Sequence, residues 1–171
     1  MLRLVILAPN WLGDAVMALP AIADVRRAMP AASITVAARA AVAPLFVLVA
    51  EVDDTIVLPP PVRFMDVAAS TSAATALASG RFDTALLLPN SVHSALVVSR
   101  AGIAERWGYR AGGRGVLLTR AIERTSGLHQ VDSYRQLVHA LGFPNGAIEP
   151  RVSVPTAARD GASRLLAECG E

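Results

Sequence analysis

Lysine is absent from this chain of 171 residues, so all 16 of its basic side chains are arginines. A bias in the coding sequence is enough to explain the absence. Whatever the cause, every basic side chain carries a guanidinium group, which can donate two N–H hydrogen bonds at once to a carboxylate or a phosphate. The formal net charge of +2 is too small to indicate nucleic-acid binding.

Cysteine is nearly absent as well, since Cys169 is the only one. A single thiol excludes an internal disulfide framework and fits a reducing compartment. The three histidines are dispersed and no carboxylate cluster stands out, so the sequence predicts no metal site. We expect no cofactor either.

Aromatic residues make up only 5% of the chain, whereas hydrophobic residues make up 53%. A core built from Ala, Val, Leu and Ile is typical of parallel sheets that helices cover on both faces. The richest apolar run, residues 40–50, contains Pro44 and is shorter than the ~20 residues of a membrane span. The length suits one soluble domain with some chain left over at the C-terminus.

Short apolar runs alternate with helical patterns along the whole chain. Strands are predicted at residues 2–7, 34–37, 55–58, 84–88 and 106–109, with a short extension at 116–119 and an extended piece around 152–154. Helices are predicted at residues 14–29, 42–49, 64–79, 91–102, 129–141 and 157–169. This alternation predicts a Rossmann-like α/β fold, an open parallel sheet with right-handed crossovers. Pro20 either kinks the first helix or resets its start.

The loop after the first strand, residues 8–14, reads Ala-Pro-Asn-Trp-Leu-Gly-Asp. A dinucleotide site would need three glycines here, and only Gly13 is present. Asp14 instead lies at a helix N-terminus, where partial positive charge favours its ionised form. A carboxylate there can accept a proton from a sugar hydroxyl, and Trp11 can stack on a sugar face. The alternative is that Asp14 only caps the helix or stabilises it by its charge, and that Trp11 is a half-buried packing residue.

Two further segments offer polar side chains. Asn90 and Ser91 follow the most apolar strand, where either residue also suits a plain helix cap. Residues 100–124 carry six arginines among glycines, which suits phosphate or carboxylate groups on a ligand, although a solvated face without a partner is the alternative. His129 begins the next helix, where capping is equally possible.

Together these residues closely resemble the ADP-heptose:lipopolysaccharide heptosyltransferases, especially the heptosyltransferase II branch. The opening segment 8–17 with Pro20 and Ala21 carries the strongest match. The resemblance then continues in the same order through nearly the whole chain, at residues 82–83, 87–91, 94–95, 101–103, 106, 108–110, 114–115, 117–119, 129 and 134.

The resemblance implies the N-terminal half of a GT-B glycosyltransferase, with residues 1–155 as the acceptor-side domain and 156–171 as a helix leading to a C-terminal donor-binding domain. It implies transfer of heptose from ADP-heptose to the lipopolysaccharide inner core, with inversion and without a metal, in the cytoplasm or at the inner face of the inner membrane. The resemblance makes Asp14 the general base. It also implies a set of acceptor-binding residues: Asn10, Trp11, Gly13, Asn90, Ser91, Arg110, Arg114 and His129.

The chain is half as long as a full heptosyltransferase, so we expect the 171 residues alone to bind ADP-heptose weakly and to transfer no sugar. A second hypothesis needs no catalysis: an α/β module that binds a small phosphorylated ligand through its arginines and helix N-termini. The sequence leaves open which sugar and which acceptor are used, and the oligomeric state.

Overall fold

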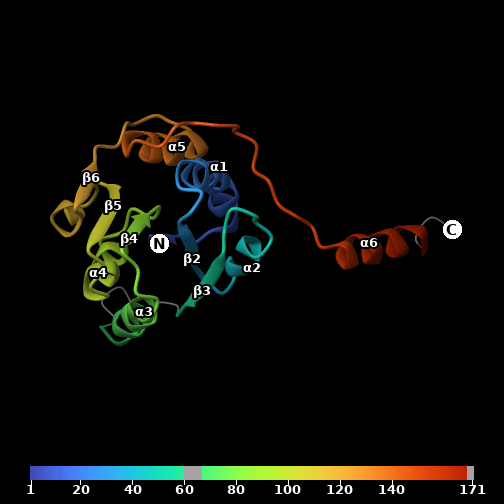
Figure 1. Ribbon diagram of the computed structural model, residues 1–171, viewed down its shortest axis with the longest axis horizontal. Coiled ribbons are helices and arrows are strands. Elements are labelled where there is room, and N and C mark those ends of the chain that lie inside the picture. The colour runs from blue at the N-terminus through green and yellow to red at the C-terminus, as the bar shows by residue number, and fades with distance from the viewer. Residues whose placement is uncertain (60–66, 169–171) are drawn as a thin grey trace.

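Six parallel strands form one sheet in the computed structural model, which describes residues 1–59 and 67–168 (Figure 1). Their order across the sheet is β3-β2-β1-β4-β5-β6, and every neighbouring pair is parallel. The predicted open parallel sheet is therefore confirmed. The strands are β1 (Arg3–Leu7), β2 (Ser33–Arg39), β3 (Asp54–Leu58), β4 (Thr84–Leu87), β5 (Glu105–Tyr109) and β6 (Arg120–Ile122).

Helices cover both faces of this sheet. Side chains alternate along a strand, so Leu4 and Ile6 of β1 join the core under α1 and α5, whereas Val5 and Leu7 join the core under α3 and α4. This arrangement confirms the Rossmann-like fold. The helices are α1 (Leu12–Ala28), α2 (Ala43–Phe46), α3 (Val67–Ser79), α4 (Val92–Arg100), the 3₁₀ helix η1 (Arg114–Leu117), α5 (Gln130–Ala140) and α6 (Thr156–Glu168).

Several predicted boundaries differ from the structure. Helix α1 begins at Leu12 rather than Asp14 and runs through Pro20, so this proline does not reset its start. Helix α2 is a single turn rather than the predicted 42–49, and Pro44 stands at its start. The extension predicted at 116–119 is wrong: a 3₁₀ turn occupies its first residues, and the sixth strand follows at 120–122, paired with β5.

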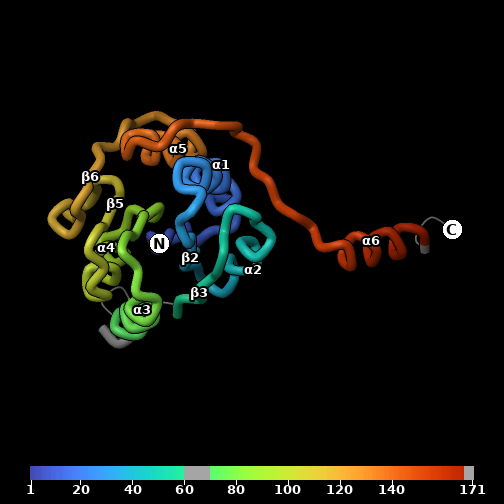
Figure 2. The backbone as a smooth tube through the Cα atoms, in the orientation of Figure 1, coloured from blue at the N-terminus to red at the C-terminus, as the bar shows by residue number. Residues whose placement is uncertain are grey.

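The C-terminal helix α6 lies apart from the sheet at the end of an extended segment (Figure 2). No strand forms around residues 152–154 in this segment. The predicted start of the third helix at 64 and the predicted end of the last helix at 169 fall outside the described residues. Within the described residues, no helix is both long and apolar enough to cross a membrane.

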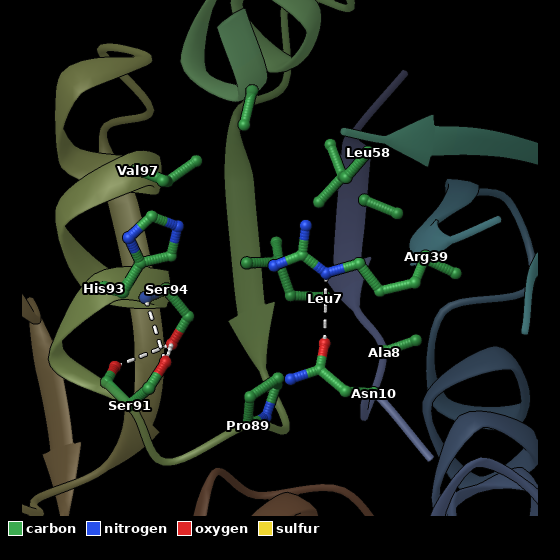
Figure 3. Close-up of a pocket in the computed structure, with 13 residues that line it drawn as sticks. Leu7, Ala8, Asn10, Arg39, Leu58, Pro89, Ser91, His93, Ser94 and Val97 are labelled. Atoms are coloured by element: carbon green, nitrogen blue, oxygen red, sulfur yellow. Dashed lines mark hydrogen bonds between the residues drawn. The ribbon is translucent and has the colours of Figure 1, made fainter. Parts of the chain in front are cut away.

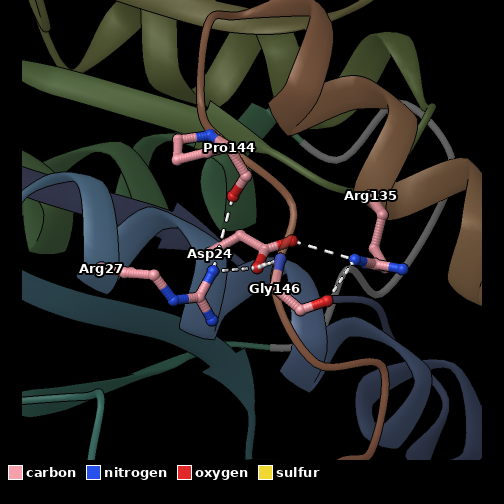
Figure 4. Close-up of polar contacts among 5 residues, drawn as sticks. All are labelled: Asp24, Arg27, Arg135, Pro144 and Gly146. Atoms are coloured by element: carbon pink, nitrogen blue, oxygen red, sulfur yellow. Dashed lines mark hydrogen bonds and ion pairs between the residues drawn. The ribbon is translucent and has the colours of Figure 1, made fainter.

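A buried carboxylate ties α1 to α5 and to the loop that follows α5 (Figure 4). The side chain of Asp24 is fully buried, and one of its oxygens pairs with Arg27 at 2.7 Å and accepts the backbone N–H of Gly146 at 2.8 Å. Its other oxygen pairs with Arg135 of α5 at 3.4 Å. Arg135 also donates to the carbonyl of Gly146 at 2.7 Å, which closes a small polar network. The network fixes the path of the chain as it leaves the sheet.

Replacing Asp24 by Asn is expected to lower the free energy of unfolding by about 2 kcal/mol. The side chain keeps its shape but loses its charge, which leaves two arginines without their partner. The cost stays below that of a fully buried pair, because Arg27 is about half exposed. Urea unfolding measures it, and Asp160→Asn on the exposed helix α6 serves as the control. Equal stability of the two variants would contradict a stabilising role for the network.

Candidate functional site

The strand order reverses between β1 and β4, which are neighbours at the centre of the sheet. The loops that leave these two strands lie side by side, because the N–H of Leu88 bonds the carbonyl of Leu7 at 3.3 Å. The N–H of Ala8 bonds the carbonyl of Ala37 at 2.9 Å, which holds the first loop against β2 as well. Ligands of open parallel sheets bind at such a reversal, beyond the carboxyl ends of the strands.

A pocket on the α1 and α5 side of this edge contains Asp14, and we call it the Asp14 pocket. Asp14 lies in the first turn of α1, three residues after the N-cap Trp11, so it does not cap the helix, but this position also suits the alternative in which its charge only stabilises the helix N-terminus. Its carboxylate is partly exposed, and no hydrogen bond or ion pair engages it within residues 1–59 and 67–168. The pocket is lined by Trp11, Asp14, Asn90, Arg124, Gln130 and Tyr134, among others.

The surroundings of Asp14 combine a flat aromatic ring with polar groups. Trp11 is 77% exposed, so the alternative in which it only packs is wrong, and its ring is free to cover a ligand. Burial raises the pKa of Tyr134 to about 12, and the negative charge of Asp14 adds to the shift. Tyr134 therefore stays protonated, and Arg124 supplies a positive charge on the same wall. A neutral or acidic polyol fits this set of groups.

Arg114, which was expected to bind the acceptor, is fully buried and is not among the residues that line the Asp14 pocket, so a direct contact with the acceptor stays a prediction. Its side chain is 0% exposed, and burial lowers its pKa to about 10. The guanidinium donates to the carbonyls of Tyr109 (2.9 Å), Pro89 and Ser91, and to Oδ1 of Asn90 at 3.2 Å. Glycine at 112 and 113, both with positive φ, lets the chain turn this arginine inward. Arg114 is thus a positioning residue that holds the loop carrying Asn90.

The other predicted residues divide between the pockets and the surface. Asn10 and Asn90 line the Asp14 pocket. Ser91 is the N-cap of α4, where its Oγ accepts the N–H of Ser94 at 3.1 Å, so capping engages it. Gly13, Arg110 and His129 are exposed and are not among the residues that line the Asp14 pocket. Arg110 pairs with the exposed Glu123 at 3.1 Å. His129 is the N-cap residue of α5, and its side chain makes no capping hydrogen bond.

A second pocket lies on the α3 and α4 side of the same edge, and we call it the Arg39 pocket (Figure 3). It is lined by Asn10, Arg39, Leu58, Pro89, His93 and Val97, among others. Asn10 and Pro89 line both pockets, so the two are neighbours across the tips of β1 and β4.

Sequence reasoning missed Arg39 and included Arg124 only as one of six arginines suited to anionic groups of a ligand. Arg39 ends β2, and the carboxyl end of a parallel strand beside β1 is the position that would have pointed to it. Arg124 stood among six arginines of similar context, and nothing in the sequence separated it from the others. Only the packing of α5 against α1 brings the segment before α5 next to Asp14.

Comparison with known proteins adds to this geometry. Residues 71–166 match the family described as glycosyltransferase family 9 (heptosyltransferase). Lipopolysaccharide heptosyltransferase 2 of Escherichia coli is 30% identical over 144 residues, which cover 83% of this chain and 41% of the relative. The protein of the same name from Salmonella typhimurium is 28% identical, over 85% of this chain and 42% of the relative. The chain thus spans about two fifths of the length of these curated relatives.

Solved structures agree with the fold. The E. coli ADP-heptose lps heptosyltransferase II superposes with a TM-score of 0.75 at 28% identity, covering 97% of this chain and 50% of that one. A family 9 glycosyl transferase from Veillonella parvula superposes with a TM-score of 0.85 over 99% of this chain and 49% of that one; at 18% identity it supports the fold alone. The family match spans more than half of the residues, so this chain belongs to glycosyltransferase family 9, the heptosyltransferases.

Proposed function

We propose that this chain forms the acceptor-binding half of an enzyme that transfers heptose from ADP-heptose to the lipopolysaccharide inner core. The observation that carries the proposal is the partly exposed carboxylate of Asp14, which pairs with no described residue, at the strand reversal of a family 9 sheet. Family membership favours this enzyme over a non-catalytic module for small phosphorylated ligands. The donor would be held mainly by the half of the relatives that this chain does not span.

The proposed step is a displacement at the anomeric carbon of the donor sugar. Asp14 accepts the proton of an acceptor hydroxyl as its oxygen attacks that carbon. The bond between the anomeric carbon and the phosphate oxygen breaks, ADP leaves with the bonding electrons, and the configuration inverts. Asp14 suits the role of base because no hydrogen bond or ion pair in the described structure occupies its oxygens and because it lines the pocket at the strand reversal. No metal or other cofactor is part of this proposal.

The residues around Asp14 would orient the acceptor. The exposed ring of Trp11 provides a stacking surface, and the amide of Asn90, held by Arg114, bonds a hydroxyl. Gly13 leaves space beside Asp14, since no atom lies within 4 Å of the position where a Cβ would stand. Arg110 and Arg124 offer charge to acidic groups at the rim, and Ser91 and His129 complete the rim at two helix starts.

The proposed acceptor bears a lipid, so we place the enzyme in the cytoplasm with peripheral contact at the inner face of the inner membrane. The second half of the same protein, with α6 leading toward it, would be its main partner. The proposed location and the proposed partner follow from the proposed acceptor and from the family. They depend on the transfer assay below, which tests that acceptor.

A transfer assay tests the proposed function directly. A protein containing this chain and a donor-binding half is incubated with ADP-heptose and inner-core oligosaccharide. Mass spectrometry should show one added heptose, and NMR of the product should show an anomeric configuration opposite to that of the donor. The 171 residues alone should give no product. Release of free heptose without any acceptor product, or retention of configuration, would contradict the proposal.

A further inference from the structure

A positive charge without a carboxylate partner among residues 1–59 and 67–168 lies in the Arg39 pocket (Figure 3). The Nε of Arg39 donates to Oδ1 of Asn10 at 3.3 Å, and its Nη1 donates to the carbonyl of Pro59; both acceptors are neutral. In the described part of the chain, no carboxylate pairs with Arg39 and none lines its pocket. Burial lowers the pKa of this arginine, so its charge is partly removed from water, and no described residue supplies a counter-ion.

A second group that can carry positive charge faces the same pocket. His93 lies in the first turn of α4, and its Nδ1 is 3.4 Å from Oγ of Ser70 on α3. Burial lowers the pKa of His93, and the charges of Arg39 on β2 and Arg100 on α4 lower it further. The same repulsion would be relieved by an anion between Arg39 and His93.

Most of the other lining residues are apolar, although Asn10, Ser91 and Ser94 also line the pocket. Leu58 at the end of β3 and Val97 on α4 form walls on two sides of the charged groups. A ligand with both an anionic group and a carbon skeleton matches this lining better than a free ion does. Since Asn10 and Pro89 also line the Asp14 pocket, a ligand can reach both pockets across the strand tips.

We propose that the Arg39 pocket is a subsite for an anionic sugar residue, whose carboxylate or phosphate is held by Arg39 and His93 while its ring lies against Leu58 and Val97. If the proposed transfer function holds, this residue belongs to the acceptor, next to the unit whose hydroxyl Asp14 activates. The subsite then selects acceptors that carry an acidic group at that distance. The anion subsite itself requires no donor and no transfer.

Titration of the isotope-labelled chain with three sugars tests the subsite. Glucuronate carries a carboxylate, glucose 6-phosphate carries a phosphate, and glucose carries neither. At least one anionic sugar should shift the NMR signals of the Arg39 Nε–H and the His93 ring and bind at least tenfold more tightly than glucose. The bound anion should raise the pKa of His93, because it favours the charged imidazole. Which of the two sugars binds identifies the anionic group.

Variants separate the subsite from general charge effects. Arg39→Gln should weaken binding of the anionic sugar about tenfold or more, and Arg159→Gln, the same change on the distant helix α6, should leave it unchanged. Melting curves check that both variants fold. Binding that is equal for glucose, unaffected by Arg39→Gln, or absent for both anionic sugars would overturn the proposal.

The outcome also stays distinct from that of the transfer assay. If the protein transfers heptose but its Arg39 pocket binds neither anionic sugar, the proposed function holds and the proposed subsite is wrong. If the pocket binds the anionic sugar but the protein transfers no heptose, the proposed subsite holds and the proposed function is wrong. If both hold, Arg39→Gln should raise KM for the acceptor by about tenfold with little change in kcat, as expected when uniform binding is lost.

Discussion

Replacing Asp14 by Asn is expected to lower kcat for heptose transfer about 10²-fold or more while the protein still folds. The amide keeps the size of the side chain but cannot take the proton from the acceptor hydroxyl, and a positioned base contributes about 10²–10⁴-fold. Acceptor affinity should change little, because Trp11 and Asn90 still line the pocket. Steady-state kinetics in protein that contains a donor-binding half measure both quantities.

Asp132 provides a matched control for this substitution. It stands three residues after the N-cap of α5, as Asp14 stands three residues after the N-cap of α1, and it lies outside the Asp14 pocket. Both Asn variants lose the same favourable interaction with a helix N-terminus, about 0.3–1 kcal/mol. Only Asp14→Asn should slow transfer. A rate loss shared by both variants would assign the effect to helix stability rather than to proton transfer.

Replacing Arg114 by Met is expected to lower the free energy of unfolding by about 3–5 kcal/mol. Methionine fills part of the volume but donates no hydrogen bonds, which leaves buried carbonyls of Tyr109 and Pro89 without their partner. In any folded fraction, kcat should also fall, because the loop that carries Asn90 loses its support. Urea unfolding gives the stability, and transfer kinetics below the unfolding transition give the rate.

Arg110→Met is the control from the same basic segment. Arg110 is exposed and pairs only with the exposed Glu123 in the described structure, so its loss should change stability by no more than about 0.5 kcal/mol. Arg114→Lys should fall between wild type and Arg114→Met, because an ammonium keeps the charge but lacks the planar fork. Similar stability of Arg110→Met and Arg114→Met would contradict the positioning role.

The architecture was predictable because its pattern is local. Runs such as 84–88 contain no polar side chain after Thr84, and a strand of that kind must be buried on both faces. The boundaries were less predictable where two local rules compete. Pro20 disfavours a helix interior, yet its neighbours Leu19, Ala21 and Ile22 bury an apolar face, and this packing carries α1 through the proline.

Residues of the candidate site were predictable only where their position relative to a predicted strand places them at the edge of the sheet. Asp14 lies in the first helical turn that follows the loop after the first strand, and in a parallel sheet that position lies at the ligand-binding edge. Arg114 and Arg110 are both arginines in one glycine-containing segment, and the sequence assigned them the same role. The structure separates them, because the turn at 112–113 directs Arg114 inward while Arg110 stays at the surface. Such a difference depends on tertiary packing, and residue type does not encode it.

The central claim is that this chain binds the acceptor at the carboxyl-end edge of the sheet, next to Asp14. Titrating the labelled 171 residues with inner-core oligosaccharide and with ADP-heptose, in separate experiments, tests it most directly. The oligosaccharide should shift the indole N–H of Trp11 and the side-chain amide of Asn90, and ADP-heptose at the same concentration should leave both unchanged. Shifts at these two residues with ADP-heptose, and none with the oligosaccharide, would contradict the claim.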